Sequence, residues 1–232
     1  MYYNNYNNKE IIKRICESAK KYKNNLLNKN IIFIFENKKK QKIEYIEVLF
    51  LAQNFLHFTG IKYEKSAGEF FKECLKNRIS PNSIKIKDKG FTQLKLEILE
   101  NAMSINKSAK RIGEYNGNKL NIKIEKVVGN THFCLGLSKL DSNSNEMRYY
   151  YPKTLIQDDL KSNIIQDNRI VAILSKHKNY EMYNEITYFS KDINLRELFE
   201  NKALRDIIDS KNIYSENLSY NQKIIDFLKC LE

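Results

Sequence analysis

The sequence predicts an α+β protein in which a helical N-terminal part is followed by an antiparallel β-sheet and then by C-terminal helices. Three observations support this fold class. Before residue 113, apolar residues recur mainly at helical spacing; from residue 120 to 189, strand-like runs alternate with turns; beyond residue 191, helical patterns return. The links between the strand-like runs are short, which favours antiparallel pairing because parallel strands need long crossovers.

The expected elements follow this order along the chain. A helix covers residues 9–27, and a hairpin joins strands 31–35 and 43–51 across a lysine-rich turn that we interpret as a charged, hydrated tip. Helices are then expected over 65–75, beginning near Ser66, and over 92–113, with Gly113 as the C-terminal stop. Strands are expected over 120–128, 132–140, 147–151, 169–174 and 183–189, with a short helix over 155–165.

Length and composition are compatible with one main domain. The 232 residues contain 42% hydrophobic and 12% aromatic residues, which suffices for a core and argues against disorder. We therefore divide the chain into a tail and helix (1–29), an α+β domain (30–190) and a C-terminal helical appendage (191–232).

The charge points to a phosphate-rich partner. The formal net charge is +12, which suits a nucleic acid, although AT-rich coding would also raise the lysine content without one. The four cysteines are scattered and acidic residues do not cluster, so we expect no metal and no cofactor. The N-terminus has no apolar stretch and no run reaches membrane-spanning length, so we expect a cytoplasmic protein without membrane contact.

Candidate site residues centre on residues 55–60, where an apolar run ends in His57, Thr59 and Gly60. Such a strand end can present side chains to a substrate. Similar polar groups recur at 129–132 and 175–177, and these three places hold all three histidines of the chain. The alternative for His57 is a hydrogen-bonded histidine inside the core.

Six short motifs in this order carry a family resemblance. They are residues 55–60 (FLHFTG), 111–117 (RIGEYNG), 129–130 (GN), 134–136 (CLG), 151–155 (YPKTL) and 169–176 (RIVAILSK). Together they resemble the phage-Barnase-EndoU-ColicinE5/D-RelE-like nuclease 4 family, over roughly residues 30–189. The resemblance implies a small nuclease-like fold whose antiparallel sheet holds the active site on an open face.

The resemblance also implies a chemistry. Members of the wider superfamily are expected to be metal-independent ribonucleases that use the substrate's 2'-hydroxyl as nucleophile and leave a cyclic phosphate. This reaction needs a base, an acid and groups that stabilise the phosphate. His57 is the candidate base or acid, since histidine ordinarily titrates near neutrality.

The remaining assignments each have a structural alternative. Thr59 and Ser175 are candidate donors to phosphate oxygens, or make ordinary strand-end hydrogen bonds. Lys176 and Arg111 are candidate cations, or a solvated lysine and a helix-end arginine. Candidate nucleic-acid-binding residues are Lys107, Lys110, Tyr149 and Tyr151. The two lysines also complement a helix dipole, and the tyrosines are also suited to packing in a sheet.

Three functions are compatible with these features. The first is a ribonuclease or toxin-like effector of a phage or mobile element that acts on RNA, with a neutralising protein as a further partner. The second is a non-catalytic protein on the same scaffold that binds RNA or a host nucleoprotein complex, such as a phage inhibitor of an RNA-guided (CRISPR) defence system. The third is a structural partner protein whose C-terminal helices form the interface.

Overall fold

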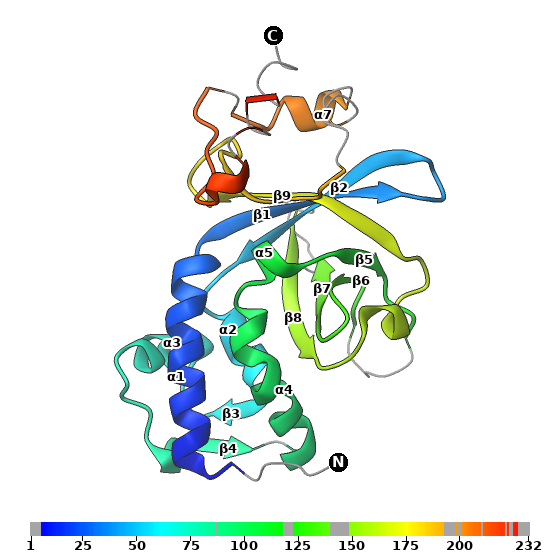
Figure 1. Ribbon diagram of the computed structural model, residues 1–232. Helices are drawn as coiled ribbons and strands as arrows, with labels where there is room; N and C mark the ends of the chain where they lie inside the picture. The colour runs from blue at the N-terminus through cyan, green and yellow to red at the C-terminus, as the bar shows by residue number, and fades with distance from the viewer. Residues whose placement is uncertain are drawn as a thin grey trace.

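A closed β-barrel lies between a group of helices and a C-terminal segment (Figure 1). The computed structural model describes residues 6–86, 88–117, 123–139 and 149–192, and beyond these 198, 201–209, 211–220, 222 and 225–226. No helix among these residues has the length and apolar character needed to cross a membrane.

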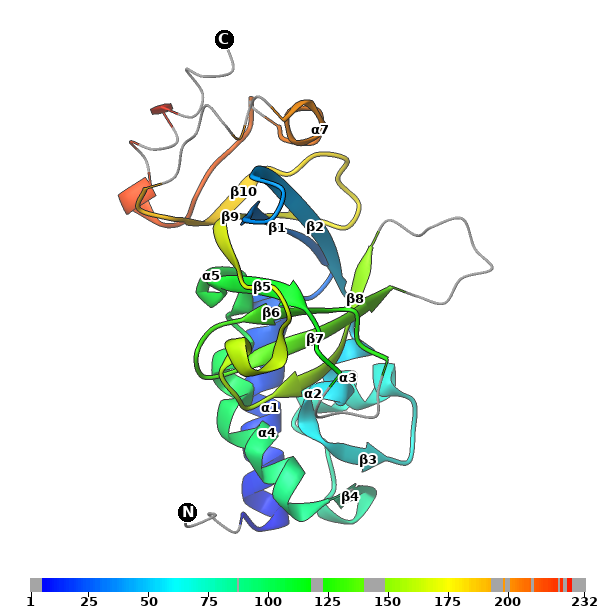
Figure 2. The same cartoon turned by 90° about the vertical axis from the view of Figure 1, so that its right-hand side faces the viewer.

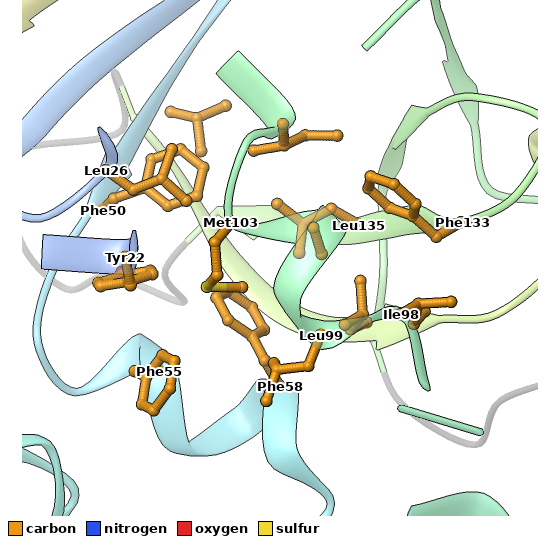
Figure 3. Packing of buried hydrophobic residues seen from close by; sticks show 14 of the residues in the cluster. Tyr22, Leu26, Phe50, Phe55, Phe58, Ile98, Leu99, Met103, Phe133 and Leu135 are labelled. Carbon is orange, nitrogen blue, oxygen red and sulfur yellow. The ribbon is translucent and has the colours of Figure 1, made fainter. Parts of the chain in front are cut away.

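The first helix, α1 (Asn8–Asn25), was predicted correctly. It begins with a capping box in which the Asn7 side chain accepts from the Glu10 backbone and the Glu10 side chain accepts from the Asn7 backbone. Its apolar side is buried, and Tyr22 occupies the centre of an aromatic cluster. The ring centroid of Tyr22 lies 5.4 Å from that of Phe55 and 5.5 Å from that of Phe71. Figure 3 shows Tyr22 near Phe50, Phe55 and Phe58. The Tyr22 hydroxyl donates to the Leu51 carbonyl at 2.9 Å, so this buried polar group is satisfied.

The predicted hairpin is present and longer than expected. It comprises β1 (Lys29–Asn37) and β2 (Lys42–Phe50), paired antiparallel along their whole length. Residues of β1 are buried on both faces: Phe33 belongs to the main core, and Ile34 belongs to a second core on the opposite face. Two covered faces explain why the run lacks the polar alternation of a half-exposed strand.

Residues 55–60 do not form the strand end that we predicted. Strand β2 ends at Phe50, and residues 54–59 form a short helix, α2 (Asn54–Thr59), which Gly60 ends in a left-handed conformation with φ 76°. A Cβ on Gly60 would lie 3.0 Å from the Cα of Thr92, so glycine also allows close packing against a later helix. The glycine therefore stops a helix rather than turning a strand.

Helix α3 (Ala67–Leu75) begins as predicted, with a capping box between Ser66 and Glu69. The strand β3 (Ile61–Tyr63) precedes this helix, and the 3-10 turn η1 (Pro81–Ser83) and the strand β4 (Ile84–Ile86) follow it. The two strands pair antiparallel and form a small separate sheet. These elements lie at the end of the molecule away from α7 (Lys202–Arg205) (Figures 1 and 2).

The predicted helix over 92–113 is wrong at its C-terminal end. Helix α4 (Lys89–Ala102) is followed by a turn, a short helix α5 (Ile105–Ser108) and a strand, β5 (Arg111–Glu114). Gly113 is a strand residue, and glycine is needed there because a Cβ would lie 2.2 Å from the Gln166 carbonyl oxygen. Arg111 is consequently a strand residue and not a helix-end cation.

The prediction of an antiparallel sheet with an open face is also wrong. After β5 come β6 (Lys126–Gly129), β7 (Cys134–Lys139), β8 (Tyr150–Ile156), β9 (Asn168–His177) and β10 (Glu185–Phe189). Seven strands close a barrel in the order β1-β2-β8-β7-β6-β5-β9. Strand β5 pairs with the start of β9, and β10 pairs with β9 further along, at residues 172–175. The N-terminal hairpin closes the ring, since β1 pairs with β9 and β2 makes a parallel contact with β8.

The remaining differences are local. Most of the helix predicted over 155–165 is replaced by the end of β8 and the 3-10 turn η2 (Leu160–Asn163). The first residues of the predicted strands 120–128 and 147–151 lie outside the described part of the chain.

The C-terminal segment covers the outer face of β1 and β9. Its described elements are the helix α7 (Lys202–Arg205) and the 3-10 turn η3 (Leu218–Tyr220). Much of the two predicted helices, including residues 195–197, 199, 224 and 227–232, lies outside the described part, and the described residues 198, 222, 225 and 226 are helical. Leu204 and Ile208 pack with Ile32, Ile34 and Leu174 in the second core. This segment therefore buries the side of the barrel that the other helices leave open.

Candidate functional site

A hollow of about 520 Å³ opens where helices α1, α4 and α5 meet one end of the barrel. It is lined by charged, amide, hydroxyl, imidazole and apolar side chains; we call it the His132 hollow. The lining residues are Lys21, Ile98, Glu100, Asn101, Ser104, Ser108, Asn130, His132, Phe133 and Gln157. Concave sites with a few converging polar groups are the usual places for small-ligand or substrate contact.

The turn between β6 and β7 holds His132 at this hollow. The Asn130 side-chain oxygen accepts from the backbone N–H groups of His132 at 2.8 Å and Phe133 at 3.2 Å, which closes a side-chain-capped turn. Phe133 is buried in the core and anchors the turn. Residue 129 must be glycine, because a Cβ would lie 2.3 Å from the Phe133 carbonyl oxygen. The turn thus leaves the imidazole exposed on a rigid base.

Within the described part of the chain, the imidazole of His132 makes one hydrogen-bonding contact. The Nδ1 atom of His132 lies 3.0 Å from the Thr131 hydroxyl oxygen, a contact that orients the ring. Among the residues that the structure describes, no hydrogen bond is made by Nε2. The outer nitrogen is therefore available for proton exchange with a ligand.

Two buried polar atoms on the hollow's wall have no hydrogen-bond partner within the described chain. They are the Ser108 hydroxyl and the Oε1 atom of Gln157. The Gln157 amide is held in place, since its Nε2 donates to Glu97 at 3.1 Å. Buried polar groups are normally paired, and both of these atoms lie beneath the surface of the hollow, so a ligand would reach them only if the lining shifts.

An exposed ion pair lies on the rim. Lys21 of α1 and Glu100 of α4 are 2.5 Å apart, and their side chains are 50% and 55% exposed. Pairs this exposed contribute little to stability. Either partner can therefore turn to a ligand at small cost to the fold.

The structure places His57 and Thr59 elsewhere. The His57 ring is exposed on α2, and its backbone carbonyl accepts from the buried Lys95 ammonium at 2.9 Å. Lys95 also donates to the Thr154 hydroxyl at 2.9 Å. Thr59 is fully buried, and its hydroxyl donates to the Leu56 carbonyl at 2.9 Å. This hydrogen bond stabilises the C-terminal end of α2.

Ser175 and Lys176 lie in the C-terminal half of β9 and are almost completely buried. The Ser175 hydroxyl donates to Glu185, whose carboxylate also accepts from Lys29 at 2.7 Å. The Lys176 ammonium donates to the Glu181 carbonyl at 2.6 Å. Ser175 is thus engaged in a polar network between β1, β9 and β10, and Lys176 is held by the loop between β9 and β10.

Arg111 lies at the start of β5 and binds Asp167 at 2.7 Å with its side chain 34% exposed. Both Figures 1 and 2 show α2 well apart from β9. The structure therefore does not assemble His57 with Ser175 and Lys176 into one site. Arg111 lies in the strand paired with the opposite end of β9, across from Arg169.

The four predicted nucleic-acid-binding residues are also dispersed. Lys107 on α5 pairs with Glu216 of the C-terminal segment at 3.2 Å. The Lys110 ammonium lies 3.5 Å from the centre of the Tyr188 ring, and burial lowers the pKa of this lysine. Tyr149 precedes β8, and Tyr151 lies within β8, opposite Ser138. Both tyrosines are half-buried.

The family model described as phage-Barnase-EndoU-ColicinE5/D-RelE like nuclease4 matches residues 14–192. The chain belongs to this family. The resemblance expected from the six motifs is thereby confirmed, and a nuclease-like function with a nucleic acid as substrate follows. Neither a curated protein nor a solved structure matches the chain.

The nuclease-like region contains the whole His132 hollow and excludes the C-terminal segment. Every lining residue, from Lys21 to Gln157, falls within the matched range 14–192. Elements α7 and η3, which cover the outer face of the barrel, fall outside it. The hollow therefore lies wholly within the part of the chain that matches the nuclease-like family.

Sequence reasoning missed most of this hollow. The signal that it did find was the polar group at residues 129–132, with glycine and asparagine before the histidine. Glu100, Ser108 and Gln157 gave no signal, because each looks like an ordinary residue of a helix or a strand end. Only the packing of α4 and α5 against the barrel brings them together.

The described residues contain no group of three or more His, Cys, Asp or Glu side chains that could hold a metal ion. Two acidic residues of α4 contact side chains that line the hollow: Glu97 accepts from Gln157, and Glu100 pairs with Lys21.

Proposed function

We propose that this nuclease-like protein is an endoribonuclease that cleaves RNA by attack of a 2'-hydroxyl on the adjacent phosphorus, without a metal ion. The observation that carries the proposal is the His132 hollow, which gathers an imidazole, a carboxylate and an ammonium group in a nuclease-family chain. These are the three kinds of group that this reaction uses.

The residues of the hollow suit distinct roles. Glu100 takes the proton from the 2'-hydroxyl, whose oxygen then attacks phosphorus and displaces the 5'-oxygen. The His132 imidazolium gives its proton to that leaving oxygen, so the products are a 2',3'-cyclic phosphate and a 5'-hydroxyl. Lys21, which pairs with Glu100 in the free protein, neutralises charge on the phosphate in the transition state.

The two unpaired atoms beneath the His132 hollow are also compatible with an RNA substrate. The Ser108 hydroxyl is suited to donate to a non-bridging phosphate oxygen, and the Oε1 atom of Gln157 is suited to accept from a sugar hydroxyl or a base N–H. If the lining shifts when a ribonucleotide binds, the ligand would satisfy groups that the protein leaves unsatisfied. Such complementarity favours substrate over water in the hollow.

The sequence-derived set of His57, Thr59, Arg111, Ser175 and Lys176 stays a competing prediction. Its serine and threonine hydroxyls are engaged inside the protein, and we therefore assign the chemistry to the His132 hollow. His57 remains a useful comparison, because its ring is exposed.

The reaction itself can be tested with labelled single-stranded RNA and DNA of the same sequence, incubated with the protein in EDTA. We expect cleavage of RNA with 2',3'-cyclic phosphate ends, and no cleavage of DNA, which lacks the nucleophile. Cleavage of both, or RNA products with 3'-hydroxyl ends, would contradict the mechanism. Salt-sensitive RNA binding without cleavage would instead favour the non-catalytic binding protein.

A further inference from the structure

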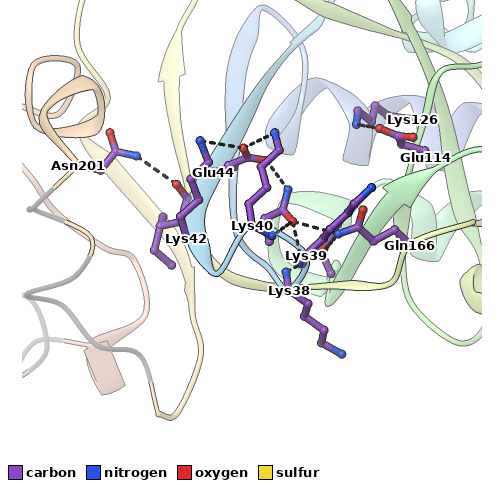
Figure 4. Close-up of polar contacts among 12 residues, drawn as sticks. Lys38, Lys39, Lys40, Lys42, Glu44, Glu114, Lys126, Gln166 and Asn201 are labelled. Atoms are coloured by element: carbon purple, nitrogen blue, oxygen red, sulfur yellow. Dashed lines mark hydrogen bonds and ion pairs between the residues drawn. The ribbon is translucent and has the colours of Figure 1, made fainter.

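The tip of the β1–β2 hairpin carries a concentration of positive charge away from the His132 hollow. Lys38, Lys39, Lys40 and Lys42 lie within five consecutive positions, and all four are exposed. Figure 4 shows them around the turn, with Glu44 as the adjacent acid. We call these four lysines the hairpin tip. In Figures 1 and 2 the end of this hairpin is well apart from α4.

The backbone of the tip is held in one conformation. The Asn37 side-chain oxygen accepts from the N–H groups of residues 39 and 40, both at 3.1 Å, and the Asn168 oxygen accepts from that of residue 38 at 3.3 Å. Gln166 donates to both asparagine oxygens, at 3.0 and 3.2 Å. Asn37 and Asn168 are 7% and 6% exposed. A turn that only kept the hairpin hydrated would not need buried amides from β1 and from the start of β9.

The positive charge of the tip is only partly neutralised. Glu44 binds Lys40 at 2.8 Å and Lys42 at 3.4 Å. Burial tends to raise the pKa of Glu44, but hydrogen bonds from Lys40, Asn37 and Lys42 outweigh it and leave this pKa below its ordinary value. Lys38 and Lys39 make no ion pair with any described residue. At least two ammonium groups on a rigid turn are therefore free for an external anion.

We propose that the hairpin tip binds the phosphate backbone of the RNA substrate at a distance from the site of cleavage. The inference rests on the proposed function for the identity of the substrate. Lysine ammonium groups recognise phosphate as point charges and carry no base-reading geometry, so this contact is independent of sequence. A preordered turn loses little conformational freedom when it binds, which makes a small contact effective.

The test uses a double variant, Lys38→Gln/Lys39→Gln, and a matched control, Lys20→Gln/Lys23→Gln. The control removes the same charge from two exposed positions of α1. Binding is measured over a range of salt concentrations with 2'-O-methyl RNA, which 2'-hydroxyl attack cannot cleave. For an unstructured strand of about 30 nucleotides, loss of two phosphate contacts lowers the salt slope by roughly 1.4 and weakens binding roughly 25-fold at about 0.1 M salt. We expect this change in the tip variant and a much smaller one in the control.

Equal salt slopes for the two variants, at equal melting temperature, would overturn the proposal. So would a loss of affinity for duplex DNA without a loss for single-stranded RNA. The binding result can be interpreted separately from catalysis. If the protein cleaves RNA but the tip variant has an unchanged salt slope of binding, only the proposed phosphate contact of the hairpin tip is refuted. If the protein does not cleave RNA but the tip variant shows the expected change in salt slope, only the proposed cleavage reaction is refuted.

Discussion

Replacement of Gly129 by alanine tests whether the turn that carries His132 is built as described. The new Cβ would lie 2.3 Å from the Phe133 carbonyl oxygen and 2.7 Å from the Cα of Cys134. These are backbone atoms, so the turn must shift, and the hydrogen bond from the Asn130 N–H to the Phe133 carbonyl, 3.0 Å long, must weaken.

Two terms set the magnitude. Overpacking of this kind typically costs about 1–3 kcal/mol, and loss of one backbone hydrogen bond adds about 1 kcal/mol. The free energy of unfolding should therefore fall by about 2–4 kcal/mol. For a chain of this size, that corresponds to a melting temperature lower by roughly 4–16 °C.

The assay is thermal unfolding followed by circular dichroism, with Gly68→Ala as the matched control. No atom lies within 4 Å of a Cβ at Gly68, which is inside α3, so alanine there should leave stability unchanged or raise it by about 0.5–1 kcal/mol. A Gly129→Ala protein as stable as the wild type would refute the packing described for this turn.

Two further changes test other parts of the account. Tyr22→Phe removes the hydroxyl that donates to the Leu51 carbonyl, so unfolding should become easier by about 1 kcal/mol; a melting temperature equal to that of the wild type would show that this bond contributes nothing. Glu44→Gln tests the lowered pKa of Glu44. A carboxyl with a depressed folded pKa contributes stability that is present above its unfolded pKa, ordinarily 4.5, and is lost as the pH falls through its folded pKa. The difference in melting temperature between wild type and Glu44→Gln should therefore disappear in acid, and a difference that persists there would contradict the assignment.

Local signals in the sequence predicted several elements well. The capping residue Ser66 marked the start of α3, and the alternation of an apolar run, a lysine turn and a second apolar run gave the β1–β2 hairpin. These features depend on neighbouring residues only. Gly60 and Gly113 were misread because a glycine stops a helix, turns a strand or permits close packing, and its neighbours in space decide which.

Closure of the barrel could not be predicted in the same way. It depends on the pairing of β1 with β9, strands separated by more than half of the chain, and on one parallel contact between Val48 and Tyr150. Most of the candidate site could not be predicted from the sequence for the same reason, because it too depends on residues that are far apart in the chain. Residues 129–132 were recognisable, but Ser108 and Gln157 become notable only because folding leaves their oxygens buried without a partner.

The measurement that tests the central claim most directly compares RNA turnover by three single variants: His132→Ala, His57→Ala and His177→Ala. His57 and His177 are also exposed, so each substitution removes one imidazole at little cost to the fold. If the His132 hollow is the active site, turnover falls by roughly 100-fold or more in His132→Ala alone, while RNA affinity is kept in all three. Full turnover in His132→Ala, or its loss in His57→Ala, would contradict the account.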